Sequence, residues 1–338
     1  MNAFLGAPEG MEPHLDKLRE SRRNLENQGD YVKRVTTHSR QLRNIIAGQD
    51  SRKILLTGPC SIHDLSVGRR VIDQIAKLQE GIAEEYKIIC RIFGEKPRTT
   101  NLDTNGNLNW RGYIAHPNYD VETRSDVLNT ETSIYDMNEL MLHALDRDLA
   151  VGTEFLSSEN AALLGPLVSY VQVGARSLQP DYIARHISQL RELCKYTSCV
   201  AGIKNPENGL LDLPRDVIRQ LNEINGENSS FLIMRGSLSG QNWEQDPNTG
   251  YIDAVAYMID AGHDNCKING KKSHEESERV LNSLINSHRL QTDSNLIGIT
   301  VESHINSGCQ SGVIDVSRDQ SLTDPCVTVK FLQDLLSN

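Results

Sequence analysis

Short apolar runs alternate with longer amphipathic segments from Lys53 to the end of the chain. The apolar runs predict buried strands, which we place at Lys53–Thr57, Tyr86–Phe93, Ala150–Phe155, Val168–Val173, Ser198–Lys204, Ser230–Arg235, Asn265–Asn269 and Leu296–Glu302. Apolar residues at helical spacing predict helices at Val67–Glu84, Ile134–Asp148, Asn160–Leu167, Pro180–Lys195, Pro214–Asn225, Tyr251–Ala261, Glu275–Ser287 and Val327–Leu336. Strands that alternate with helices in this way are typical of an α/β fold of the (βα)8 TIM-barrel type.

A doubly wound open sheet is the alternative fold, and it would usually carry a G-x-G-x-x-G turn after its first strand. The turn in this chain reads Gly58-Pro59-Cys60-Ser61 and therefore favours the barrel. Residues 1–50 are polar and helix-prone, so we expect an N-terminal helical extension there and the barrel domain at residues 51–338. We expect this extension to pack on the outside of the barrel or on a partner subunit.

The composition is that of a soluble globular protein, with 38% hydrophobic and 24% charged residues. A net charge of -10 disfavours a nucleic-acid binder, so any anion site must be a local cluster of cations. No apolar run approaches the roughly 20 residues that span a bilayer. The seven cysteines are scattered without a C-x-x-C pair, which is typical of reduced cytoplasmic proteins. We therefore expect a cytoplasmic enzyme that binds neither nucleic acid nor membrane.

Cationic residues recur at the predicted carboxyl ends of the strands, which share one face of a barrel. They are Arg91, Lys96, Arg176, Lys204 and Arg235. Any one of them could be a simple strand-end ion pair, but so many like charges at one face would repel each other without an anionic ligand. Because Lys and Arg bind phosphate and carboxylate oxygens strongly, the cluster predicts phosphorylated small-molecule substrates.

The stretch from Gly94 to Thr100 follows the second strand and adds to this cluster. Pro97 fixes one backbone angle and pushes Lys96 toward an extended conformation, so the turn is stiff before any ligand arrives. Arg98 and Thr99 add a guanidinium group and a hydroxyl group. A basic surface turn is the simpler interpretation of this stretch alone, but its place among the other cations favours a phosphate site.

A second candidate site combines sulfur and oxygen ligands. Cys60, Glu302 and Asp324 would form a set suited to a divalent transition ion of borderline softness, if the fold brings them together. The residues alone leave two other roles open, because Cys60 could be a core thiol and Asp324 could be a helix N-cap.

These residues resemble the type I 3-deoxy-D-arabino-heptulosonate 7-phosphate (DAHP) synthases, first enzymes of the shikimate pathway of aromatic amino acid biosynthesis. The resemblance runs from about His38 to Leu336. Its motifs are Gly58–Asp64, Glu95–Thr100, Trp110–Gly112, Glu154–Leu156, Gly174–Arg176, Lys204–Asn205, Arg235–Gly236, Val301–His304 and Ser321–Asp324. It implies a transferase that condenses phosphoenolpyruvate (PEP) with erythrose 4-phosphate in an aldol-like reaction and releases phosphate.

Roles for individual residues follow from the resemblance alone. It implies that PEP is bound by Arg91, Lys96, Arg176, Lys204 and Arg235. It implies that the aldose phosphate is bound by Lys96, Pro97, Arg98 and Thr99. Cys60, Glu302 and Asp324 would be three of the four ligands of a divalent metal such as manganese, iron, cobalt or zinc. Lys96 would donate a proton, and Glu154 would orient the water that adds to PEP.

The chain departs from the family at the fourth metal ligand, a His in a strand-seven motif I-D-x-S-H. We align that motif with Ile268–Lys272, which places Lys272 at the His position. A protonated Lys has no lone pair for a metal. Three outcomes remain open: His274 substitutes, the metal binds weakly, or the Lys272 ammonium group takes the place of the ion as a catalytic group.

Two other functions are therefore kept as alternatives. The chain could be a divergent paralogue in a specialised pathway that acts on another sugar phosphate, either without metal through Lys272 or with Lys272 or Lys204 as a Schiff-base nucleophile. It could also be an inactive barrel that binds a ligand as a regulator, although such a scaffold would have no need for the cation cluster. We expect a homo-oligomer, with a dimer as the working hypothesis.

Overall fold

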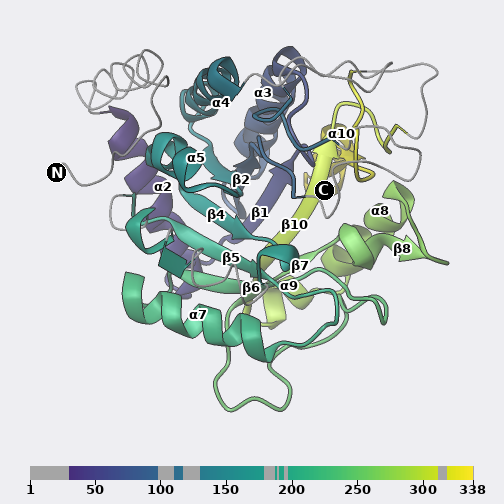
Figure 1. Ribbon diagram of the computed structural model, residues 1–338. Coiled ribbons are helices and arrows are strands. Elements are labelled where there is room, and N and C mark those ends of the chain that lie inside the picture. Colours follow the sequence, from purple (N-terminus) through teal and green to yellow (C-terminus); the bar gives the residue numbers. More distant parts are fainter. Residues whose placement is uncertain are drawn as a thin grey trace.

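The computed structural model describes residues 30–97, 110–116, 130–178, 187–188, 190–193, 197–310 and 318–337. Arg98 and Thr99 of the predicted substrate site lie outside these residues, as does most of the predicted helix Pro180–Lys195. Within the described residues the chain forms a parallel β-barrel with helices around it (Figure 1).

Eight parallel strands close the barrel in chain order. They are β1 (Lys53–Gly58), β2 (Tyr86–Arg91), β3 (Ala150–Thr153), β4 (Tyr170–Val173), β5 (Val200–Lys204), β6 (Ser230–Met234), β7 (Tyr257–Asp260) and β10 (Leu296–His304). β10 pairs with both β7 and β1, which closes the sheet on itself. A short strand, β11 (Val327–Thr328), pairs with the last residues of β10. The predicted (βα)8 barrel is confirmed.

Helices cover the outside of these strands (Figure 1). The described ones are α2 (Asp30–Ile46), α3 (Leu65–Ile82), α4 (Thr130–Leu145), α5 (Ser158–Leu164), α7 (Asp212–Asn225), α8 (His274–Asn286), α9 (Arg289–Thr292) and α10 (Val329–Leu336), with 3-10 turns η1 (Gly165–Leu167), η2 (Ala175–Leu178) and η3 (His263–Cys266). The Asp64 carboxylate accepts the Val67 N–H at the start of α3, and the Ser157 hydroxyl oxygen accepts the Asn160 N–H at the start of α5. These N-caps set where the turns after β1 and β3 end.

The helix α2 closes the amino-terminal end of the barrel. Its residues Leu42, Ile45 and Ile46 pack in one interior cluster with inward residues of the strands, such as Ile54 and Phe231. Residues 30–46 of the predicted extension therefore contribute to the core at this end of the barrel.

The sequence-based placement of strand seven is wrong. We predicted a helix at Tyr251–Ala261 and a strand at Asn265–Asn269, whereas the seventh barrel strand is β7, Tyr257–Asp260. A short, fully buried strand carries apolar residues on both faces, so its sequence is compatible with a helix as well. The later segment forms η3 and a two-stranded antiparallel hairpin, β8 (Lys267–Ile268) and β9 (Lys271–Lys272).

The connection between β6 and β7, residues 235–256, is described in full and contains no helix. Its irregular backbone is held from outside instead. The Arg215 guanidinium group of α7 stacks on the Tyr251 ring at 3.9 Å, and Arg289 of α9 donates to the carbonyl oxygen of Trp243 at 2.7 Å. Among the described helices, none is both long and apolar enough to cross a membrane.

The barrel tolerates no side chain at Gly298 in β10. A Cβ atom there would overlap the backbone of Ile54 in β1, which cannot move aside without breaking the strand pair. We expect Gly298→Ala to lower the free energy of unfolding by at least about 2 kcal/mol, as measured by urea denaturation. Gly81→Ala in α3 is the matched control, because its nearest contact lies 3.9 Å away and alanine favours helix. Equal stability of the two variants would contradict the prediction.

Candidate active site

Charged side chains of both signs meet at the carboxyl-terminal mouth of the barrel. Each predicted substrate-binding cation at a strand end has a carboxylate partner there: Arg91–Glu302 at 3.0 Å, Lys204–Asp260 at 2.9 Å, Arg235–Asp264 at 2.9 Å and Arg176–Glu207 at 3.6 Å. The first three pairs are buried, whereas Arg176, in η2, is half exposed. Our argument that the cations require an anionic ligand to avoid repulsion was therefore wrong, because internal carboxylates balance them.

Three buried polar atoms of the predicted substrate-site residues have no hydrogen-bond partner among the described residues. They are Nη1 of Arg91, Nη1 of Arg235 and Oε1 of Glu154. Arg91 is fixed by its other atoms, since its guanidinium group stacks on the Phe93 ring at 4.1 Å while Nη2 donates to Glu302. Burial raises the pKa of Glu154, although the nearby cations oppose this shift. Fixed donors and an acceptor are thus available to a ligand.

Lys96 lies between these pairs and the sulfur-containing group. Its buried Nζ donates to Cys60 Sγ at 2.8 Å and lies 3.4 Å from Asp324 Oδ2. Burial alone would lower the pKa of Lys96, but Cys60, Asp324 and Glu302 together raise it. Lys96 is therefore a fixed cation at the centre of the mouth.

The turn that carries Lys96 is held by backbone and side-chain contacts. The Lys96 N–H donates to the carbonyl oxygen of Arg111 at 2.9 Å, and the neighbouring Glu95 carboxylate accepts the Leu156 N–H at 3.0 Å. Burial raises the pKa of Glu95 to about 7. These contacts link the turn, up to Pro97, to the loop that follows Glu154.

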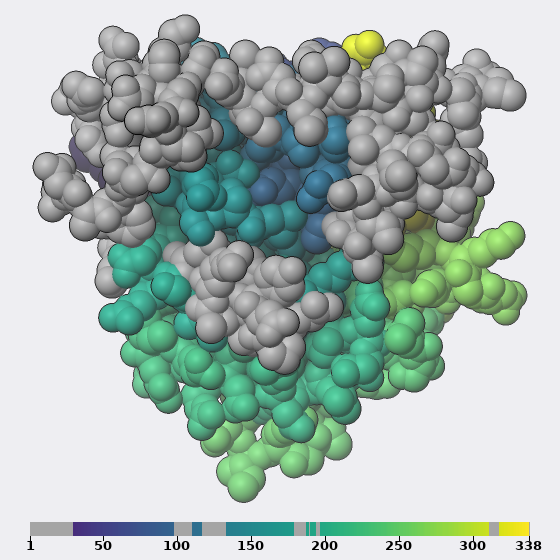
Figure 2. All heavy atoms as spheres, viewed as in Figure 1, coloured from purple at the N-terminus to yellow at the C-terminus, as the bar shows by residue number. Residues whose placement is uncertain are grey.

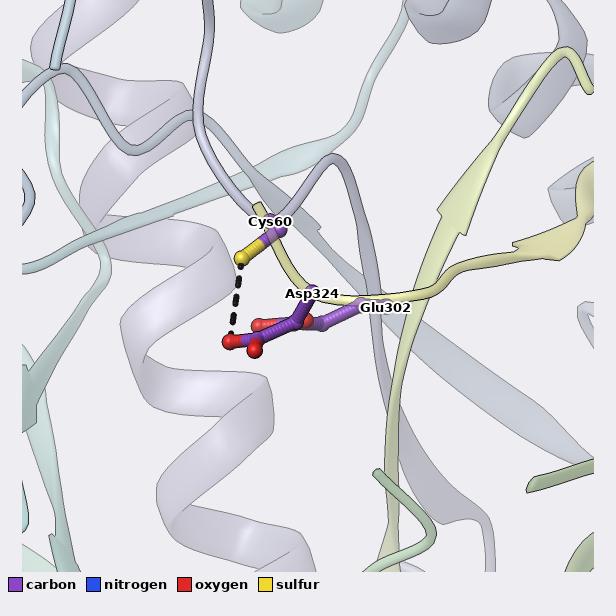
Figure 3. A group of neighbouring side chains, drawn as sticks. All are labelled: Cys60, Glu302 and Asp324. Atoms are coloured by element: carbon purple, nitrogen blue, oxygen red, sulfur yellow. Dashed lines mark hydrogen bonds between the residues drawn. The ribbon is translucent and has the colours of Figure 1, made fainter. Parts of the chain in front are cut away.

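Cys60, Glu302 and Asp324 are brought together as predicted. One ligand atom of each lies within 4.8 Å of the others, and Cys60 Sγ is 3.6 Å from Asp324 Oδ2 (Figure 3). They come from the turn after β1, from β10 and from the loop before β11. Burial raises the pKa of Cys60 to about 11, and the adjacent Glu302 carboxylate adds to the effect. A bound cation would instead favour the thiolate form.

His263 is a site residue that the sequence analysis missed. It follows β7 in η3, with Nδ1 2.9 Å from Asp260 Oδ2 and Nε2 3.9 Å from Glu302 Oε1. The signal was present, because Ile259-Asp260-Ala261-Gly262-His263 has the I-D-x-x-H spacing at the end of the true seventh strand. Aligning the motif with Lys272 was wrong, since Lys272 is on β9 of the hairpin.

The family of the chain is shown by a match to a family model, described as the DAHP synthetase I family, over residues 31–335. The chain belongs to this family. Its members are enzymes that form a carbon–carbon bond. The match spans the barrel and most of α2, so the resemblance drawn from the strand-end motifs is confirmed.

Similar proteins of this family include the Trp-sensitive phospho-2-dehydro-3-deoxyheptonate aldolase of Escherichia coli K12. It is 25% identical over 320 residues, which cover 87% of this chain and 84% of the relative. A phospho-2-dehydro-3-deoxyheptonate aldolase of Haemophilus influenzae is 27% identical over 316 residues, which cover 85% of this chain and 80% of the relative. The solved structure of the Francisella tularensis SCHU S4 phospho-2-dehydro-3-deoxyheptonate aldolase matches with a TM-score of 0.76, 24% identity and 91% coverage of both chains, which supports the fold.

The donor groups fit the divalent metal that the DAHP synthetase I family implies. Thiolate and imidazole groups suit iron, cobalt and zinc, and carboxylate groups also suit manganese. Asp260 lies 2.9 Å from Nδ1 of His263, as a carboxylate that orients a histidine ligand does, while Nε2 lies 3.2 Å from Lys204 Nζ and 3.9 Å from Glu302 Oε1. The described residues therefore offer three grouped ligand side chains, Cys60, Glu302 and Asp324, and His263 lies beside Glu302 as an additional imidazole.

Proposed function

We propose that this protein condenses PEP with erythrose 4-phosphate and releases phosphate. The observation that carries the proposal is the placement of Lys96 between a group of buried Arg and Lys side chains and the Cys60, Glu302 and Asp324 group. Relatives named phospho-2-dehydro-3-deoxyheptonate aldolase support this reaction over the other two functions that the sequence left open.

We propose that PEP binds to the cation set, with its phosphate and carboxylate oxygens on Arg91, Arg176, Lys204 and Arg235. The unused Nη1 donors of Arg91 and Arg235 can bind these oxygens without first breaking the existing ion pairs. Each charge-assisted hydrogen bond to an oxygen contributes about 1.5–3 kcal/mol. The aldose phosphate lies on the other side of Lys96, at the turn that contains Lys96 and Pro97, and Arg98 and Thr99, the next two residues of the sequence, are proposed to bind it as well.

In the condensation, C3 of PEP forms a bond to the aldehyde carbon of the acceptor. Lys96 donates a proton to the aldehyde oxygen as this bond forms, which its position near both groups supports. Water then adds to C2 of PEP, and the bond from C2 to the phosphate oxygen breaks with its electron pair leaving on the phosphate. As the C2 ketone forms, one proton of the water leaves with the phosphate and the other restores the proton that Lys96 donated. Glu154 has an unused, buried acceptor oxygen with which to orient the water. A divalent ion held by Cys60, His263, Glu302 and Asp324 would polarise the aldehyde as a Lewis acid.

The Schiff-base alternative has less support from the geometry. Although burial opposes it, the Asp324 carboxylate raises the pKa of Lys272, and a protonated amine is a poor nucleophile. Lys204 does have a lowered pKa because it is buried, but its Nζ is 2.9 Å from Asp260. Both amines are therefore engaged by carboxylates.

The reaction is tested by measuring phosphate release from PEP with a panel of aldose phosphates. We expect release with erythrose 4-phosphate, its loss after treatment with a chelator, and its recovery on addition of manganese, iron, cobalt or zinc. No release with any aldose phosphate would contradict the condensation. Full activity after chelation would contradict only the proposed requirement for a divalent metal.

We also propose that the protein works as a cytoplasmic homo-oligomer, with a dimer as the expected state. The expectation rests on the sequence and on its family resemblance. The test is the molar mass measured by light scattering coupled to size-exclusion chromatography. The molar mass of a single chain at micromolar concentration would contradict the expectation.

A further inference from the structure

The hairpin formed by β8 and β9 stands at the mouth of the barrel, between η3 and α8. It turns at Asn269 and Gly270, whose φ angles of 51° and 80° are those of a two-residue turn with both central residues left-handed. After the hairpin, the Ser273 hydroxyl oxygen accepts the Glu276 N–H and caps α8. The hairpin projects from the surface at the right of the molecule (Figures 1 and 2). It is thus anchored at its base and free at its tip.

One side chain of this projecting hairpin returns to the active site. Lys272 Nζ donates to Asp324 Oδ1 at 2.8 Å. The other oxygen, Oδ2, is 3.4 Å from Lys96 Nζ and 3.6 Å from Cys60 Sγ. Each oxygen of the proposed metal ligand Asp324 therefore faces an ammonium group. An incoming divalent cation would therefore lie close to these two positive charges, which repel it.

We propose that Lys272 is an internal cation that competes with the divalent metal for Asp324. In the metal-free protein its ammonium group neutralises this carboxylate, and it leaves when the metal binds. This inference rests on the proposed metal in the function given above. It also assigns a role to the lysine that is different from a substitute for the metal or a Schiff-base nucleophile.

The lysine that leaves is Lys272 rather than Lys96. The Lys272 side chain is 25% exposed and starts from a hairpin two residues after Gly270, so it can swing into solvent. The Lys96 side chain is 12% exposed and is also bound to Cys60 Sγ. Moving Lys96 would break two contacts and disrupt the turn that holds the substrates. Moving Lys272 breaks one ion pair.

The competition sets a threshold for metal loading. Because the Lys272 ammonium group neutralises Asp324 and repels an incoming dication, it lowers the affinity for all divalent ions by a similar factor. Ions that bind thiolate and imidazole strongly still load, whereas magnesium and calcium, which prefer oxygen ligands, fall below useful affinity. Metal loading also frees the hairpin at the mouth.

The test measures metal binding directly, on the full chain. Purified metal-free protein is titrated with cobalt, followed by the thiolate-to-cobalt absorbance band, and with manganese by equilibrium dialysis. Since a charge-assisted hydrogen bond no longer has to be broken, we expect Lys272→Gln to bind each ion about 10-fold to 100-fold more tightly than the wild type. Lys272→Arg keeps the charge and should bind close to the wild type.

The control is Lys271→Gln, which removes an exposed charge one residue away on the same strand. If Lys271→Gln and Lys272→Gln raise the affinity equally, the effect is one of general charge and the proposal is overturned. Amide hydrogen exchange over residues 267–273 should rise on manganese binding in the wild type and not in Lys272→Gln. Thermal unfolding confirms that each variant is folded.

The failure of the proposed function gives a different result. If neither the wild type nor Lys272→Gln shows a cobalt–thiolate band, Cys60 holds no metal, and both the competition and the proposed metal centre are overturned. If the band appears and is lost in Cys60→Ala, the metal centre is present. The metal affinities of the Lys272 variants then test the competition independently of the result of the phosphate-release assay.

Discussion

Replacing Lys96 with methionine is expected to lower kcat for the condensation by about 10²-fold to 10³-fold, the cost of removing one fixed donor from developing negative charge. The ammonium group is buried 2.8 Å from Cys60 Sγ and 3.4 Å from Asp324, at the point where the two proposed substrates meet. Methionine fills a similar volume but provides neither the proton nor the charge. The effect on kcat should exceed the effect on the KM for PEP, because other cations remain to bind this substrate.

The measurement is steady-state phosphate release with saturating metal and erythrose 4-phosphate. Lys53→Met is the matched control, since Lys53 donates to the Leu296 carbonyl oxygen at the first residue of β1, at the opposite end of the barrel. A variant at Lys96 that keeps kcat and raises only KM would show that the lysine binds substrate without taking part in the chemical step.

Replacing Arg91 with methionine should cause the largest loss of stability, about 3–5 kcal/mol in the free energy of unfolding, because it leaves a buried carboxylate without its partner. Arg91 and Glu302 are 2% and 3% exposed, with their charged atoms 3.0 Å apart. The stacking of Arg91 on Phe93 is lost as well. The change is measured by urea denaturation in the presence of chelator, so that metal binding does not contribute.

Two comparisons make this prediction specific. The double variant Arg91→Met with Glu302→Gln should recover part of the loss, because no unpaired charge then remains in the core. Arg219→Met removes one partner of an exposed pair with Asp216 and should cost less than about 1 kcal/mol. If Arg91→Met and Arg219→Met were equally stable, the Arg91–Glu302 pair would not contribute to the fold.

Most of the barrel could be predicted from the sequence because its strands are short, apolar and separated by amphipathic helices. β1, β2 and β6 lie where the apolar runs place them. β7 could not be placed, because its four residues are buried on both faces and no helix separates it from β6. The Asn269-Gly270 pair is a strong hairpin signal that should have excluded a barrel strand at this position.

The sequence predicted which residues form the candidate site better than it predicted how those residues contact one another. The grouping of Cys60, Glu302 and Asp324 was correctly predicted, because the fold and the family motifs both indicated it. We assigned Lys272 instead of His263 to the position of the fourth metal ligand because we had misplaced the seventh strand. The carboxylates that balance the cations, Asp260 and Asp264, were not predicted, because a carboxylate in a sequence gives no sign of which distant cation it will contact.

The internal pairing of charges at the barrel mouth has a consequence for the biogenesis of the protein. Asp260, Asp264 and Glu302 give Lys204, Arg235 and Arg91 their counter-ions within the same polypeptide. A newly synthesised chain can therefore complete its folding before it encounters a substrate or a metal ion. The protein can mature in a cell that is short of either and wait as a folded apoenzyme.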